Sequence, residues 1–513
     1  MVHTPTVTVS AARRSASPMR RVAEVAAVFS VFLAYTHLFR DTFVDDAFIS
    51  LKYSDMLAAG EGWTFLPGRM SNTATSPLNV IVHAAIGMLI GSMPYAIVVA
   101  TALELTVSFF LLQRIARHLF GHTYFAWLAI VGLATNCLLV STFGLEGTLF
   151  TVLLLWSVER FLAQRWIHLG IVLGLIVMAR PDGALLVPIY MAAMPGRWTQ
   201  RVSVALVCAL TLAPWELFSW VHLGSFVPDT LQIKVGQRGW GRGLSLVSGM
   251  GFYFQKYPLE FLAAFTLAPF VPLAWRSSSR EVKTVASVLA GYGVLHLAAY
   301  TVMGIPPYHW YYTNQAVPAV IVGALGVTVL VTQAWQRASG MSRAALAVTV
   351  LLPAAGLAVS TSRIGWPLKQ APIHTNWGTH DEYREVGLWL RQHIPDDTTI
   401  FMVSEMGTVP FYAQRLIINE FSDANMIYKP ILERYPTLPW PAQRAVDVNF
   451  FWRRLQPPVA DWPYKLHHYE WPNDDEASFR DQIVKSWDTS TRWIPSGRLY
   501  LIRLKPASQP PAK

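Results

Sequence analysis

Charged side chains are scarce in this chain: they make up 14% of its 513 residues, whereas hydrophobic residues make up 53%. Soluble globular domains average about 25% charged residues. The composition therefore excludes a set of ordinary soluble domains and indicates an integral membrane protein. Cysteine is almost absent as well. Cys137 and Cys208 both lie in apolar runs, which argues against a disulfide framework or a Cys-rich metal site.

The charges that are present are unevenly distributed. Residues 1–360 carry 23 Lys/Arg and 14 Asp/Glu, whereas the much shorter segment 361–513 carries 18 and 17. The net charge of +10 therefore belongs almost wholly to the apolar part, and we expect no nucleic-acid partner. The rise in the density of charged residues after residue 360 predicts a membrane body (22–360) followed by an extracytoplasmic soluble α/β domain (361–505). Within the body we expect an external loop (40–93). A cytoplasmic tail (1–21) precedes the body, and a disordered tail (506–513) follows the soluble domain.

Apolar runs long enough to cross a bilayer predict a polytopic α-helical membrane protein with eleven transmembrane helices. Nine are single runs, near 22–39, 94–113, 123–140, 147–163, 200–220, 258–275, 284–303, 312–333 and 343–360. The run 167–194 is too long for one span and is interrupted by Arg180-Pro-Asp-Gly, which predicts two short spans meeting at a turn. The run 77–90 is too short to cross and predicts an interfacial or re-entrant helix.

The basic residues of the membrane body give the orientation. Fifteen of the 23 fall in alternate short loops on one side, which the positive-inside rule assigns to the cytoplasm. The N-terminus is then cytoplasmic and the C-terminal domain extracytoplasmic. No small-residue cleavage site follows the first apolar run, so we expect an uncleaved span there; a signal peptide over residues 1–39 is the alternative.

Carboxylates gather on the predicted external side, and the richest segment is the first external loop. Asp45 and Asp46 are adjacent there, and neighbouring like charges push their pKa values apart, which suits a general base with an orienting or metal-binding partner. The alternative is that Asp45 caps a short helix over 46–59 that Gly60 ends.

Other external residues have similarly open interpretations. Glu146 lies in a tight turn, where it is either solvated or part of a site. Arg180 forms either a local ion pair with Asp182 or a phosphate contact. Lys234 ends the loop that begins at His222. Within the aromatic segment 304–312, where rings commonly serve as membrane anchors, a histidine at position 309 deserves a test. Glu104, inside a predicted span, closes an interhelical hydrogen bond or marks a site.

Six short motifs lie along the external side of the chain. They are Asp45-Asp46-Ala-Phe-Ile-Ser-Leu-Lys-Tyr, Gly60-Glu-Gly62, Thr75-Ser-Pro-Leu78, Gly144-Leu-Glu146-Gly147, Arg180-Pro-Asp182-Gly and Gly224-Ser-Phe-Val-Pro-Asp229-Thr230 to Lys234. In their order, spacing and external placement, these motifs resemble those of the polytopic GT-C glycosyltransferases, in particular the bacterial branch that includes cell-wall arabinofuranosyltransferases. Leu145, Gly147 and Asp229 depart from that branch's pattern.

The resemblance implies a multi-pass enzyme of the bacterial inner (plasma) membrane. It would transfer a sugar, arabinofuranose being one candidate, with inversion from a polyprenyl-phosphate donor to a cell-envelope glycan, lipid or protein acceptor. A loop-one aspartate is the implied base. The resemblance implies no definite cofactor, and a divalent cation is a candidate. The implied site residues are Asp45 and Asp46 for catalysis, with Asp46 as the candidate cation ligand; Arg180, Lys234 and His309 for the donor phosphate; and Glu146, Asp182, Asp229 and Tyr308 for substrate.

Two other classes of protein also need many spans. A transporter or lipid flippase usually binds its cargo at the bilayer midplane between repeated halves, but this chain has no visible repeat, and its charges lie near the external face. A catalytically silent scaffold is the other alternative.

The C-terminal segment predicts an α/β fold, with an amphipathic helix over 381–393 and buried strands over 398–404 and 415–419. Its tryptophans suit either sugar stacking or core packing. They are Trp440, Trp452, Trp462, Trp471, Trp487 and Trp493.

Overall fold

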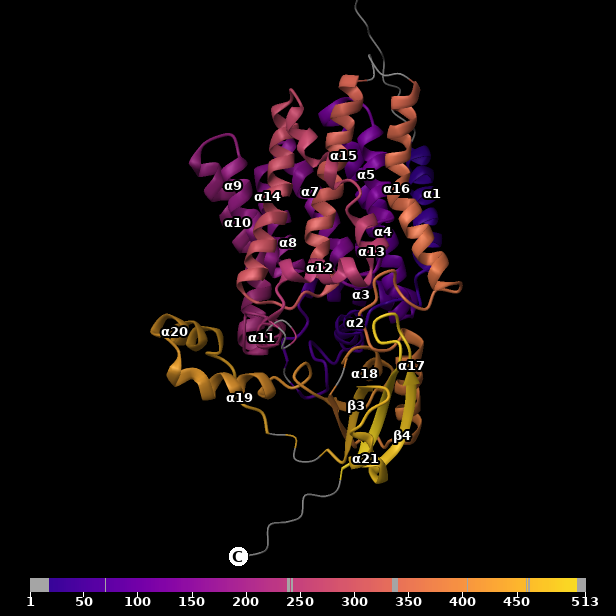
Figure 1. The fold of residues 1–513 in the computed structure, drawn as a ribbon. Coiled ribbons are helices and arrows are strands. Elements are labelled where there is room, and N and C mark those ends of the chain that lie inside the picture. Colours follow the sequence, from indigo (N-terminus) through magenta and orange to yellow (C-terminus); the bar gives the residue numbers. More distant parts are fainter. Residues whose placement is uncertain are drawn as a thin grey trace, which may run out of the picture.

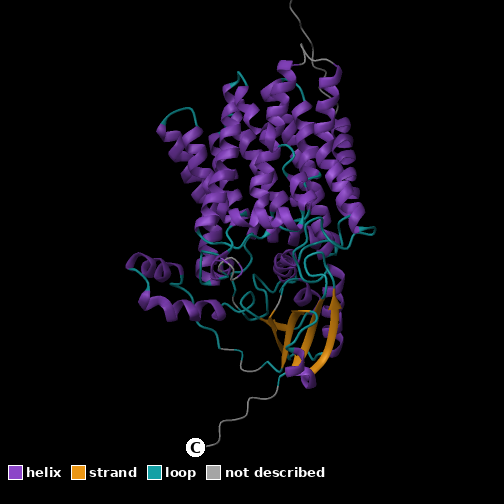
Figure 2. Cartoon of the chain, in the orientation of Figure 1, coloured by secondary structure: helices purple, strands orange, loops and turns teal. Residues whose placement is uncertain are grey.

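The computed structural model describes residues 18–504, except 70, 238, 239, 241, 242, 335–339, 404, 458, 460 and 461. The predicted tail 506–513 and most of the tail 1–21 lie outside the described residues. A bundle of helices stands on a smaller part that contains a sheet (Figures 1 and 2).

The helices of the bundle are mostly apolar and pack around one large hydrophobic core. They are α1 (Pro18–His37), α4 (Met93–Phe120), α5 (Tyr124–Ala134), α6 (Cys137–Val140), α7 (Gly147–Leu162), α8 (Trp166–Ala179), α9 (Leu186–Ala193), α10 (Trp198–Phe218), α13 (Pro258–Ala264), α14 (Arg280–Val302), α15 (Thr313–Ala334) and α16 (Gly340–Ile364). Short 3-10 or π segments interrupt or extend them: η1 (Pro181–Leu185), η2 (Ser219–Leu223), η4 (Ala268–Arg276) and η5 (His309–Tyr312).

Among the described residues, five helical segments are long and apolar enough to cross a membrane, which agrees with a multi-pass protein. They are Met93–Phe120, Trp198–Leu223, Pro258–Arg276, Arg280–Val302 and His309–Thr332. The run 77–90 forms the short helix α3 (Pro77–Ile90), and the run 167–194 breaks at η1, both as predicted. The total of eleven spans stays a prediction.

Two predicted runs are divided where the sequence supplies a reason. The run 123–140 separates into α5 and α6 at Asn136, whose side chain accepts hydrogen bonds from the N–H groups of Leu138 and Leu139 and so caps α6. Its amide also donates to the carbonyl of Ala264. The run 258–275 separates into α13 and η4, in which Pro269 and Pro272 lack the N–H that an α-helix uses.

Glu104 in α4 accepts a hydrogen bond from the Thr148 hydroxyl of α7. This confirms the interhelical hydrogen bond that was one of its two interpretations.

The end of the bundle nearest the sheet carries three helices that hold motif residues, α2 (Asp45–Ala58), α3 and α11 (Asp229–Gly236). The helix α12 (Leu246–Lys256) follows α11 at this end. The basic loop between α9 and α10, with Arg197, lies at the opposite end (Figure 1). The motif-bearing helices and this basic loop are therefore at opposite ends of the bundle.

The C-terminal sheet is mixed, with the order β2-β1-β3-β5-β4. The second strand in this order, β1 (Thr399–Val403), runs parallel to β2 (Leu416–Ile418) and to the central strand β3 (Tyr464–Glu470). The antiparallel strands are β5 (Gly497–Arg503) and β4 (Ile483–Thr489). The helices α17 (His380–His393), α18 (Thr408–Ala413) and α21 (Glu476–Phe479), with η7 (Arg480–Gln482), complete this part. The predicted helix 381–393 and the two predicted strands, 398–404 and 415–419, agree with α17, β1 and β2.

The sheet shares its hydrophobic core with the external loop. Ile49 and Tyr53 of α2 and Phe65 of the loop belong to the same buried cluster as Val386 of α17 and Leu466 of β3. The loop that carries the Asp pair is therefore held from both sides, by the bundle and by the C-terminal part.

A further pair of helices, α19 (Asn425–Arg434) and α20 (Trp440–Asn449), is joined by η6 (Tyr435–Thr437). Together they extend sideways beyond the bundle, on the side of α9 and α10 (Figure 1).

Candidate active site

A cavity of about 700 Å³ lies between the outer end of the bundle and the C-terminal part. Pockets for small ligands commonly have about 300–1,000 Å³, so it has room for a sugar-phosphate group. Its polar lining comes from α2, η1, α10, α11, α14 and η5 and from the segments just before α3, α7 and η1. These residues are Asp46, Ser50, Thr73, Thr75, Glu146, Arg180, Asp182, Glu216, Thr230, Lys234, Tyr300 and Tyr311. Five of the nine residues implicated by the sequence are among these.

Asp46 and Lys234 face each other across part of this cavity. The Asp46 Oδ1 atom lies 3.7 Å from Nζ of Lys234. The Lys234 ammonium also lies 3.9 Å from the ring centroid of Tyr308, in a cation–π contact. Burial alone would lower the pKa of Lys234, but Tyr308 and Asp46 outweigh it and raise that pKa, so the side chain is a cation.

Arg180 is held by two carboxylates. Its Nε and Nη2 donate to the two oxygens of Asp182 at 3.0 and 2.8 Å, and its Nη1 donates to Glu146 at 2.5 Å. His296 and Tyr300 of α14 also contact Asp182, at 3.1 and 2.8 Å. The predicted local ion pair is confirmed, and it includes Glu146, which is not a solvated loop acid. The guanidinium nevertheless lines the cavity.

The position of Asp45 agrees with neither interpretation drawn from the sequence, a base in the cavity or the cap of a helix over 46–59. It does not cap its own helix, because α2 begins at Asp45 and Val44 is the N-cap residue. It does not line the cavity either. Its carboxylate accepts 2.7 Å hydrogen bonds from the N–H groups of Gly407 and Thr408, and only 2% of the residue is exposed. Burial raises the pKa of Asp45 to about 6.

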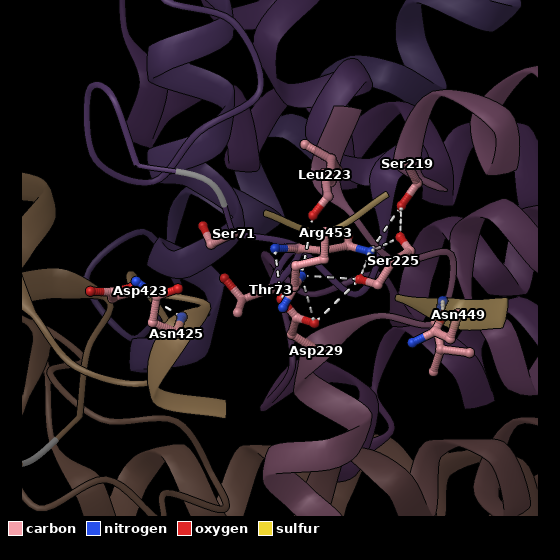
Figure 3. Close-up of polar contacts among 12 residues, drawn as sticks. Ser71, Thr73, Ser219, Leu223, Ser225, Asp229, Asp423, Asn425, Asn449 and Arg453 are labelled. Atoms are coloured by element: carbon pink, nitrogen blue, oxygen red, sulfur yellow. Dashed lines mark hydrogen bonds and ion pairs between the residues drawn. The ribbon is translucent and has the colours of Figure 1, made fainter. Parts of the chain in front are cut away.

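Asp229 is also absent from the cavity lining. It is fully buried and pairs with Nη2 of Arg453 at 2.9 Å, as Figure 3 shows. Its Oδ2 accepts from the N–H of Asn72, whose carbonyl in turn accepts from the N–H of Asp229. The residue therefore ties the external loop and α11 to the C-terminal segment, and a direct contact with substrate is not supported.

His309 is buried outside the cavity, where its Nδ1 lies 3.1 Å from the Thr375 hydroxyl and its Nε2 lies 3.4 Å from the Ser141 carbonyl oxygen. The predicted phosphate contact of His309 is therefore not supported. Tyr308 acts indirectly, because its ring packs on Lys234 and its hydroxyl donates to Gln237 at 3.0 Å.

Several cavity residues were not identified from the sequence. Glu216 of α10 is one, and its Oε2 has no hydrogen-bond partner among the described residues. An ionisable residue in an apolar run is the signal that could have identified it. Trp215 and Trp220 line the same wall, and Phe421 comes from the C-terminal part. No pattern in the sequence brings Phe421 to the cavity.

The structure offers little support for a metal at Asp46. Within the described part of the chain, the group of three metal-ligating side chains is Asp41, His380 and Asp381, which lies outside the cavity. Asp46 instead has an ammonium as its ion-pair partner. We therefore derive no step through a metal ion.

Comparison with solved structures identifies the fold. ArnT from Cupriavidus metallidurans bound to undecaprenyl phosphate superposes with a TM-score of 0.56 at 14% identity, over 94% of this chain and 98% of that one. The protein has the fold of the GT-C glycosyltransferases. An oligosaccharyltransferase from Archaeoglobus fulgidus matches at a TM-score of 0.54 and 12% identity, over 89% of this chain and 70% of the other.

The GT-C fold is also present in the arabinofuranosyltransferase AftD from Mycobacteria, with a TM-score of 0.50 and 16% identity. That match covers 94% of this chain but only 40% of AftD, so the chain spans less than half of that enzyme. No protein-family model and no curated protein sequence matches this chain. In this chain, the helical bundle, the loop before α3 and the C-terminal part all contribute to the lining of one cavity.

Proposed function

We propose that the protein is a membrane glycosyltransferase that transfers a sugar from a polyprenyl-phosphate donor to an acceptor hydroxyl at the outer membrane face. The observation that carries this proposal is the pairing of the Asp46 carboxylate with the Lys234 ammonium, 3.7 Å apart, inside the cavity of a GT-C fold. The Asp46 carboxylate can accept a proton, and the Lys234 ammonium can bind a phosphate.

Asp46 is the base in this proposal. Its carboxylate takes the proton of the acceptor hydroxyl while the acceptor oxygen forms a bond to the anomeric carbon of the donor. The bond from that carbon to the phosphate oxygen breaks, and its electron pair leaves with the lipid phosphate. Attack opposite the leaving group inverts the anomeric configuration. Lys234 stabilises the negative charge that develops on the phosphate.

Arg180 has a secondary role at the phosphate. Two carboxylates already neutralise it, so it acts by orienting Glu146 and Asp182 and by offering its remaining N–H groups to the ligand. We assign Glu146 and Asp182 to the hydrogen-bonding of sugar hydroxyls, since both carboxylates line the cavity.

The wall formed by α10 and η2 supports a lipid-linked donor. Trp215, Leu217 and Trp220 line the cavity, and 57% of Leu217 is exposed at the surface of the bundle. An apolar wall that continues onto the outer face of a membrane helix lets a prenyl chain remain in the bilayer while its phosphate reaches Lys234. The neighbour ArnT is bound to undecaprenyl phosphate in its crystal structure.

A direct test is reconstitution of the purified protein with single polyprenyl-phosphate sugars, arabinofuranose first because of the motif resemblance, together with envelope glycan, lipid or protein acceptors. Mass spectrometry measures the free polyprenyl phosphate and the modified acceptor. The proposal predicts that both products form in equal amounts. Movement of intact donor between leaflets without cleavage would instead support the flippase alternative.

A further inference from the structure

The two-helix segment 425–455, here called the arm, exposes an unusual set of large apolar side chains. Trp440 and Phe451 are each 67% exposed, Leu455 is 52% exposed and Trp452 is 45% exposed. Large apolar side chains exposed along one short segment mark a surface that binds something apolar. The arm lies outside the membrane-spanning part of the chain, so its location does not by itself explain this exposure.

The position of the arm indicates what covers it. The arm reaches sideways beyond the bundle, close to the end that faces the sheet (Figure 1). At its inner end, the ring centroids of Phe451 and Trp452 lie 6.2 and 6.1 Å from the ring centroid of Trp220. The Trp220 Nε1 also donates to the carbonyl of Val448 at 2.7 Å.

Trp220 indicates how deep in the bilayer this contact lies. It lies three residues before the end of the apolar segment Trp198–Leu223, whose surface is largely exposed, as at Leu217 and Val221. Tryptophan at the end of such a segment sits at the boundary between acyl chains and headgroups. The aromatic surface of the arm is therefore continuous with a lipid-facing surface, at headgroup depth.

The charges of the arm fit the same environment. Its two acids are Glu433 and Asp447. The Asp447 carboxylate accepts a 2.7 Å hydrogen bond from the Tyr435 hydroxyl and lies 3.4 Å from Nη1 of Arg444, in an ion pair at the surface. Four basic side chains are exposed: Lys429, Arg434, Arg444 and Arg454. Exposed Trp and Phe next to an excess of Lys and Arg are typical of elements that lie in the membrane interface and attract anionic lipids.

We infer that the arm is an interfacial anchor that lies on the outer leaflet beside α10, with its aromatic side chains among the lipid headgroups and its basic side chains on anionic lipids. Val448 and Trp220 both line the cavity. The anchor therefore holds the lateral edge of the cavity at the level of the bilayer surface. This inference does not depend on the proposed reaction.

Single cysteines test the contact in the full-length protein, placed in lipid nanodiscs. Trp440→Cys, Phe451→Cys and Leu455→Cys are each labelled with an environment-sensitive fluorophore, and nitroxide-bearing phosphatidylcholine is the quencher. Val484→Cys on β4 is the matched control, since Val484 is 43% exposed on the same C-terminal part. The native Cys137 and Cys208 are buried, so the unsubstituted chain reports background labelling.

The inference predicts blue-shifted emission and strong loss of signal to the lipid nitroxide at the arm positions, and neither effect at position 484. Arm labels that behave like the control would overturn it. Shielded labels that the lipid quencher does not reach would also overturn it, because a protein surface would then cover the arm. The exposed basic residues predict stronger quenching when phosphatidylglycerol is added, and equal quenching would contradict their role.

Discussion

Asp45 and Asp46 are adjacent in the chain, yet their carboxylates have different partners. Asp46 faces the Lys234 ammonium in the cavity, whereas Asp45 accepts hydrogen bonds from backbone N–H groups that precede and begin α18. One carboxylate is available to a substrate and the other fixes the first turn of α2 to the C-terminal part. The pair therefore combines a chemical role and a positioning role.

Lys234→Ala tests the phosphate site. Hydrogen bonds to charged groups contribute about 1.5–3 kcal/mol, so we expect the Kd for undecaprenyl phosphate to rise by about tenfold to a hundredfold. Binding of the lipid phosphate to the purified variant measures this. Lys256→Ala is the control, because that lysine is exposed and does not line the cavity. Equal affinity of the two variants would remove Lys234 from the site.

Arg180→Ala should act mainly on stability. It leaves Glu146 and Asp182 without their cation, and breaking a buried ion pair by removing one partner costs about 3–5 kcal/mol. We expect a clear fall in Tm in detergent. Adding Glu146→Gln removes one of the unpaired charges and should recover part of the loss. An unchanged Tm in Arg180→Ala would show that the cluster does not stabilise the turn between α8 and α9.

Gly407→Ala should loosen the contact between α2 and the C-terminal part. A Cβ atom at Gly407 would lie 1.8 Å from the backbone oxygen of Asp45, so the two segments must separate. We expect faster hydrogen exchange in α2 and α18 and lower transfer activity. Gly251→Ala on α12 is the matched control, because nothing lies within 4 Å of its Cβ position. Identical exchange in the two variants would argue against this contact.

The same interface should respond to pH. Glu405 accepts hydrogen bonds from the Tyr383 hydroxyl and from Nδ2 of Asn376. Burial, together with the neighbouring Asp45, raises the pKa of Glu405 to about 8, and burial raises that of Asp45 to about 6. Both groups bind their proton more tightly in the folded protein than in the unfolded chain. Their contribution to stability is therefore full at low pH and is lost as the pH rises through these values.

Glu405→Gln removes the carboxyl group that has the higher pKa of the two. Thermal unfolding measured from pH 5 to pH 9 should show a fall in Tm for the parent chain that continues through pH about 8. In the variant, the Tm should stop falling at a pH near the pKa of Asp45, about 6. A parent Tm that rises over this interval would contradict the raised pKa values.

Local patterns in the sequence predicted much of this arrangement. The interrupted run at Arg180, the short helix α3 and the helix α17 follow from periodicity and from turn residues, all of which are properties of neighbouring residues. The motifs also contain Asp46, Arg180 and Lys234, which the fold brings to one cavity.

The roles of individual side chains depend on distant partners. Asp45 bonds to a residue 362 positions away, and Asp229 pairs with Arg453 at a separation of 224. Because successive residues on a helix point about 100° apart, the sequence of α2 alone does not tell which aspartate faces the cavity. His309 shows the same limit, since Thr375 and Ser141 occupy both of its ring nitrogens.

The most direct test of the central claim compares Asp46→Asn with Asp45→Asn in single-turnover transfer at saturating donor. A positioned base contributes about 10²–10⁴-fold in rate, so Asp46→Asn should lose that factor and keep its donor affinity and Tm. Asp45→Asn should keep most of its rate but lower the Tm, because one backbone N–H at α18 loses its acceptor. A large rate loss in Asp45→Asn with normal transfer in Asp46→Asn would contradict the account.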